Sequence, residues 1–127
     1  MDPTKTISRE ELKQKMEDQE EFVLIDVLSE LSYTQAHVPD AVNINLHGDD
    51  DFVTEVSNQF PDKGQEIIVY CSNSESTESE TALKKLTDAG YTNVTRFAGG
   101  LKDWAKGEYK FEGEDAEETA YTLRESS

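Results

Sequence analysis

The stretch EIIVYCSNSESTESETALKKL, residues 66 to 86, contains the pattern that decides the fold. Its first part, Glu66–Tyr70, is apolar and largely β-branched, which is typical of a strand buried on both faces. Its last part places Ala82, Leu83 and Leu86 at the spacing of one helical face. A buried strand that leads through a loop into an amphipathic helix is the building unit of a parallel α/β sheet.

The same alternation continues outward in both directions. Further strands are predicted at Phe22–Val27, Ala41–Asn45 and Val94–Ala98. The predicted helices run from about Arg9 to Asp18 behind a Ser8–Glu11 capping box, over residues 29–37, after an Asp51 cap, from a Thr77–Glu80 capping box to Ala89, and after Gly99-Gly100. Buried strands that alternate with helices predict an α/β domain with a mainly parallel sheet.

The 127 residues suffice for one domain, and the composition changes after Gly107. Residues 1–107 are predicted to form this domain, and residues 108–127 a loose acidic tail that is poor in apolar side chains. Tyr109, Phe111 and Tyr121 are the side chains that could hold parts of the tail against the domain.

The net charge of −16 and the pI near 4.3 describe a strongly acidic surface. Such a surface repels nucleic acid and anionic membranes, so neither is expected as a partner. Two explanations of the acidity stay open, namely a host with high internal salt and an ordinary solvated acidic face. No apolar run is long enough to span a membrane and the first residues lack a signal-peptide stretch, so a cytoplasmic protein is expected.

Cys71 is the chain's one cysteine, and it follows the strand Glu66–Tyr70 directly. A single thiol and two histidines make a metal site of the usual kinds improbable. Sites in parallel sheets form beyond the carboxyl ends of the strands, where Cys71 and also Asp26 are placed. If Thr77 caps a helix, the loop before it leads to free N–H groups that stabilise a thiolate. A buried and inert cysteine is the other interpretation.

Four segments, in order, resemble the rhodanese (sulfurtransferase) family over residues 7–104. They are LIDV at 24–27, AHVPDAVNI at 36–44, IIVYC at 67–71 and AGYTNVTRFAGGLKDW at 89–104. The resemblance implies a single-domain fold with a central, mainly parallel sheet of about five strands and helices on both faces.

The resemblance also implies a chemistry. Cys71 would take sulfane sulfur from a donor, thiosulfate or a persulfide, and pass it to a thiol or protein acceptor. No metal or organic cofactor is implied. Apart from the resemblance, the position of Asp26 at another strand end leaves two interpretations open, namely support of the loop and a hydrogen-bonded turn residue. The backbone N–H groups that would hold the persulfide belong to Ser72, Asn73, Ser74, Glu75, Ser76 and Thr77.

Some positions depart from the family pattern. Ser74 stands where a glycine is common, Leu28 where an arginine often follows the first strand, and the loop has Glu75 but no basic residue. These departures favour an alternative, a rhodanese-like module for protein binding or regulation. The carboxylate of Glu75 also favours a persulfide donor over thiosulfate. A phosphatase would need an arginine at position 77, so this third function is set aside.

Overall fold

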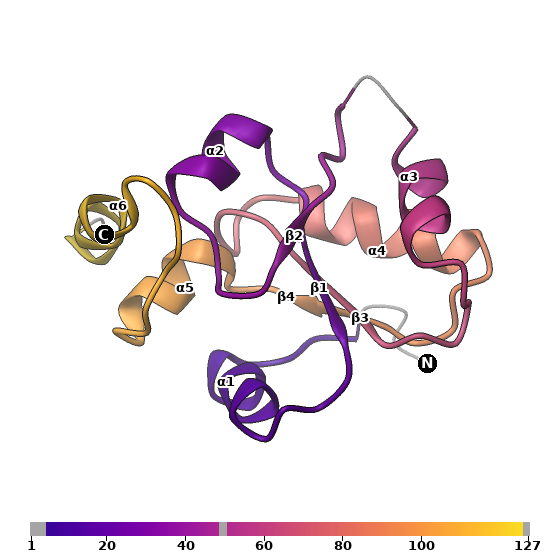
Figure 1. Ribbon diagram of the computed structural model, residues 1–127, viewed down its shortest axis with the longest axis horizontal. Helices are drawn as coiled ribbons and strands as arrows, with labels where there is room; N and C mark the ends of the chain where they lie inside the picture. Colours follow the sequence, from indigo (N-terminus) through magenta and orange to yellow (C-terminus); the bar gives the residue numbers. More distant parts are fainter. Residues whose placement is uncertain (1–4, 49–50, 126–127) are drawn as a thin grey trace.

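The computed structural model describes residues 5–48 and 51–125, and a parallel sheet lies at the centre of the molecule (Figure 1). Its four strands within these residues stand in the order β2-β1-β3-β4, where about five strands were predicted. Thr6 adds an isolated parallel bridge to Arg96 at the β4 edge. The strands are β1 (Val23–Asp26), β2 (Val42–Asn43), β3 (Ile67–Tyr70) and β4 (Val94–Phe97).

Helices cover both faces of the sheet. In Figure 1, α1 lies on one side, and α3 and α4 lie on the other. The helices are α1 (Arg9–Glu17), α2 (Glu30–Gln35), α3 (Phe52–Gln59), α4 (Glu78–Asp88), α5 (Gly100–Lys106) and α6 (Ala116–Glu125). The predicted alternation of buried strands and helices is therefore confirmed. None of the helices in the described ranges is long and apolar enough to cross a membrane.

The side chains of β4 show how the two faces differ. Phe97 points toward α5, where its ring meets the edge of Trp104 with centroids 6.3 Å apart. Its neighbour Arg96 points to the opposite face and bonds to Ser79 of α4. This alternation follows from the period of two in a strand. An arginine is thereby placed in the interior, on the face that α4 covers.

Two of the three predicted helix caps are confirmed. Ser8 and Glu11 form the reciprocal capping box of α1, and the Asp51 carboxylate accepts a hydrogen bond from the Thr54 N–H. The capping box at Thr77 is wrong: Thr77 occupies the cap position of α4 but its side chain forms no capping hydrogen bond. Its ψ of 2° differs from the extended backbone of most capping residues. Ser76 Oγ instead accepts a bond from the Glu78 N–H at 3.4 Å.

The segment predicted as a loose tail contains α6, which the sequence analysis missed. Helix α6 packs against α5, and Ala120 is buried in its centre. An antiparallel bridge also joins Glu112 to His37 through hydrogen bonds of 2.8 and 2.9 Å. Ala116, Ala120 and Leu123 recur at the spacing of one helical face, and this pattern was overlooked because the segment is strongly acidic. The domain boundary at residue 107 stays a prediction.

Candidate functional site

Cys71 is held at the carboxyl end of β3 by the beginning of α5. The Cys71 carbonyl accepts a hydrogen bond from the Leu101 N–H at 3.1 Å, and the Ser72 carbonyl accepts one from the Lys102 N–H at 2.9 Å. Gly100 makes this close approach possible, since its φ is +63° and a Cβ there would overlap the Cys71 carbonyl oxygen. A non-glycine residue would pay both for the left-handed backbone and for the overlap. Gly100 therefore allows the loop to pack closely against the beginning of α5.

The sulfur atom of Cys71 lies in the interior with no exposed surface. It is 3.3 Å from Ser79 Oγ, 3.8 Å from the Asn73 carbonyl oxygen and 4.0 Å from the Ser76 carbonyl oxygen. Since a carbonyl oxygen only accepts, these contacts suit a thiol that donates its proton. In the part of the chain that the structure describes, no backbone N–H donates to this sulfur.

Two of the loop amides expected around the sulfur have another partner in this structure. Asn73 Oδ1 accepts hydrogen bonds from the N–H groups of Glu75 and Ser76, at 2.9 and 3.1 Å. This side chain closes the loop on itself in the manner of an Asx turn. This contact was not predicted from the sequence, although asparagine is a common turn residue whose side chain bonds to backbone N–H groups further along the chain. That the amides of residues 72–77 hold a persulfide stays a prediction.

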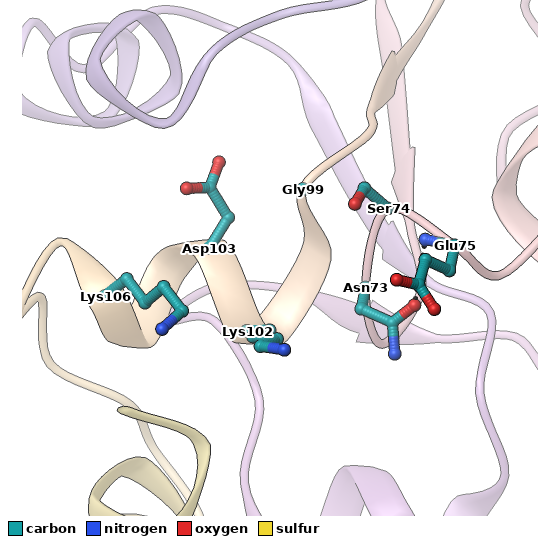
Figure 2. Close-up of a pocket in the computed structure, with 7 residues that line it drawn as sticks. All are labelled: Asn73, Ser74, Glu75, Gly99, Lys102, Asp103 and Lys106. Atoms are coloured by element: carbon teal, nitrogen blue, oxygen red, sulfur yellow. Dashed lines mark hydrogen bonds between the residues drawn. The ribbon is translucent and has the colours of Figure 1, made fainter. Parts of the chain in front are cut away.

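A cavity of about 440 Å³ opens between this loop and α5 (Figure 2). Asn73, Ser74 and Glu75 form the loop side, and Lys102 and Lys106 project from the helix side. Gly99 and Asp103 complete the lining, which does not include Cys71.

The two lysines bring positive charge to a site whose loop has none. The sequence analysis missed them because they follow the loop by some thirty residues along the chain. The available signal was that Lys102 and Lys106 are four residues apart, which places them on one face of the helix after Gly99-Gly100. The Asp103 carboxylate is bound to Arg9 of α1 at 2.7 Å, so α1 is joined to the same helix.

A third cation, Arg96, is connected to the sulfur through one hydroxyl. The Arg96 side chain is 9% exposed, and its Nε donates a hydrogen bond of 2.8 Å to Ser79 Oγ. Ser79 is fully buried in the first turn of α4 and is the same residue whose hydroxyl lies beside Cys71. The sequence analysis read Arg96 only as part of a strand. A charged residue in a buried strand is costly to bury, and that cost was the signal.

Asp26 is fully buried at the end of β1, next to the strand that bears Cys71. Its carboxylate accepts hydrogen bonds from the Leu28 N–H at 2.9 Å and from the Tyr70 hydroxyl at 2.8 Å. Burial raises the pKa of Asp26 to about 6, against the opposing effect of these two donors. The Tyr70 hydroxyl also accepts a hydrogen bond from the Val38 N–H. Asp26 thus links the turn at Leu28, strand β3 and the segment at Val38, without touching the sulfur.

Metal ligands do not gather in this region. Over residues 5–48 and 51–125, histidine, cysteine and carboxylate side chains form no group of three that could hold an ion.

Comparisons with known proteins point to one family. The family model described as Rhodanese-like domain matches residues 8–107. A protein named Sulfurtransferase from Allochromatium vinosum is 27% identical over 100 residues, which cover 79% of this chain and 87% of that protein. The Thiosulfate sulfurtransferase GlpE of Pseudomonas syringae pv. syringae is 29% identical over 82 residues, covering 65% of this chain and 71% of that protein.

Solved structures give the same result. The solution structure of the rhodanese-like domain of the Anabaena sp. Alr3790 protein matches with a TM-score of 0.77 and 27% identity, covering 91% of this chain and 82% of that one. Longer relatives also match. The chain spans only 23% of the adenylyltransferase and sulfurtransferase proteins of Candida albicans and Arabidopsis thaliana.

Proposed function

The chain belongs to the rhodanese-like domain family, and from that premise we propose that it is a sulfurtransferase whose sulfur carrier is Cys71. The observation that carries the proposal is the placement of the chain's one thiol. It lies at the carboxyl end of a central strand, before a helix N-terminus, and within contact of a hydroxyl that a buried arginine holds. Sites of parallel sheets are formed at such strand ends.

The proposed reaction has two displacements. The Cys71 thiol first loses its proton, and the thiolate attacks the outer sulfur of thiosulfate or of a persulfide. A new S–S bond forms on Cys71 while the donor's S–S bond breaks, and sulfite or a thiolate leaves with the electron pair. A nucleophilic acceptor, a thiol or a protein, then attacks the outer sulfur, and Cys71 leaves as the thiolate again.

Access to the sulfur requires a movement of the loop. Because Cys71 is fully buried and the cavity ends at Asn73, Ser74 and Glu75, these residues separate a donor in the cavity from the thiol. Their displacement would also release the Glu75 and Ser76 amides from Asn73. The freed amides would then be available to a persulfide, which is charged and needs donors.

The choice of donor follows from the charges of the cavity. Glu75 disfavours an anion, and Lys102 and Lys106 on the opposite side favour one. Because these charges act in opposite directions, both thiosulfate and a persulfide are to be tested as donors. For the acceptor, the net charge of −16 favours a protein with a basic surface.

One observation favours a second function. The thiol is fully buried and its backbone contacts are carbonyl oxygens, which repel a thiolate. A domain that keeps this arrangement at all times would serve as a module for protein binding or regulation.

Steady-state turnover separates the two functions. The purified protein is assayed with thiosulfate and with a low-molecular-weight persulfide, at low and high salt, with a thiol acceptor. The sulfurtransferase gives turnover that Cys71→Ser abolishes, with parallel double-reciprocal lines of a two-step displacement. A folded protein without Cys71-dependent turnover on either donor would favour the binding module.

A further inference from the structure

We propose that Arg96 is a positioning residue for Cys71. Arg96 acts through the Ser79 hydroxyl and stabilises the Cys71 thiolate. The inference rests on the proposed function in one respect, since it gives the thiolate of that reaction its stabilising group. The loop has no basic residue, and a cation of β4 that reaches the sulfur through Ser79 would take that place.

The first step is the geometry of the three side chains. Arg96 Nε donates to Ser79 Oγ at 2.8 Å, and Ser79 Oγ lies 3.3 Å from Cys71 Sγ. They come from three different elements, namely β4, α4 and the residue after β3. Ser79 and Cys71 are fully buried and Arg96 is 9% exposed, so solvent screens this chain of contacts little.

The second step is the charge of Arg96. Among residues 5–48 and 51–125, no carboxylate forms an ion pair with this guanidinium. Arginine keeps its proton in proteins, and a buried charge without a counter-charge is costly. A thiolate at position 71 would supply the missing negative charge. The fold thus tolerates this buried cation at lower cost when Cys71 is ionised.

The third step is the hydrogen atom of Ser79. A hydroxyl has one proton to donate and two lone pairs. Arg96 occupies one lone pair, and the Cys71 thiol donates to the other. When Cys71 loses its proton, the hydroxyl can rotate and donate to the thiolate without movement of any heavier atom. The other two contacts of the sulfur are carbonyl oxygens, which have no proton to give. Ser79 is therefore the contact that can follow the ionisation.

The remaining charges around the site are mixed. Glu75 in the loop and Glu78 in the first turn of α4 oppose a thiolate, and His47 approaches Glu78 to 3.5 Å. Helix α5 contributes the cations Lys102 and Lys106. Strand β1 contributes the buried carboxyl group of Asp26. Arg96 is connected to the sulfur through a chain of hydrogen bonds.

The test is the pH dependence of Cys71 alkylation by iodoacetamide. The rate at high pH, where the thiol is fully ionised, reports access to the sulfur, and the midpoint of the profile reports how well the thiolate is stabilised. For Arg96→Gln and Ser79→Ala we expect the midpoint to move upward by about one pH unit, which makes alkylation about tenfold slower at neutral pH. Arg96→Lys restores part of the shift because it keeps the charge. Arg124→Gln in α6, a matched loss of one arginine, leaves the profile unchanged.

An unmoved midpoint in both Arg96→Gln and Ser79→Ala would overturn the inference. If Arg96→Gln fails to fold, Ser79→Ala decides alone, because it removes one small hydroxyl. Sulfur loading of the unaltered protein from a persulfide is measured in parallel. Shifted midpoints without loading would sustain the role of Arg96 and refute the proposed function, whereas loading with unmoved midpoints would do the reverse.

Discussion

Replacement of Asp26 by asparagine should remove a specific dependence of stability on pH. The carboxylate is fully buried at the end of β1, where burial raises its pKa from 3.8 to about 6. Between these two values the folded chain holds a proton that the unfolded chain has lost. The contribution of Asp26 to stability is therefore fully present below about pH 4 and is lost as the pH rises through about 6.

The size of the effect follows from the two pKa values. At 1.36 kcal/mol for each pKa unit, a folded value of about 6 against 3.8 corresponds to about 3 kcal/mol. The asparagine does not titrate, and its Oδ1 can still accept the hydrogen bond of the Leu28 N–H. Asp26→Asn thus keeps part of the local structure and removes the proton equilibrium.

Chemical denaturation at a series of pH values from about 4 to 7, at constant high salt, measures the free energy of unfolding of both proteins. The other carboxylates titrate in both, so only the difference between the two curves matters. Relative to Asp26→Asn, the unaltered protein should lose about 2 kcal/mol over this range, because the unfolded carboxyl group is already partly ionised at pH 4. A difference that stays constant with pH would refute the reasoning, whatever its absolute value.

Two further substitutions test the position of the loop and the charge of the cavity. Gly100→Ala places a methyl group on the Cys71 carbonyl oxygen. We therefore expect chemical denaturation to show a loss of more than about 2 kcal/mol in the free energy of unfolding. The control Gly64→Ala meets only ordinary contacts and should stay close to the unaltered protein. Equal stability of the two variants would contradict the close approach. Glu75→Arg reverses a charge in the cavity wall and should raise the rate of sulfur transfer from thiosulfate by at least about threefold at low salt, with a smaller gain at high salt. A rate that responds to neither the substitution nor salt would show that Glu75 does not act through its charge.

Much of the fold could be predicted because its strands are short apolar runs. Glu66–Tyr70 and Phe22–Val27 were recognisable since strands buried on both faces need apolar residues throughout. Helix α6 was missed because the acidic composition after Gly107 was interpreted as a loose tail, although Ala116, Ala120 and Leu123 recur at helical spacing. The cap at Thr77 was misjudged because the loop backbone has another conformation there.

The candidate site divides in the same way. The position of Cys71 at a strand end follows from local sequence, since the strand and the loop are both visible in it. The contact between Arg96 and Ser79 joins residues 17 positions apart in different elements, and no local pattern encodes it. The Asn73 side chain that takes two loop amides depends on the loop's own conformation, which many polar loops of similar composition would not share.

The most direct measurement is the intact mass of the protein after incubation with a persulfide donor, followed by mapping of the modified peptide. The proposed function predicts one additional sulfur atom on Cys71, which a thiol acceptor removes and which Cys71→Ser never acquires. A folded protein that gains no sulfur, under conditions in which iodoacetamide still alkylates Cys71, would contradict it.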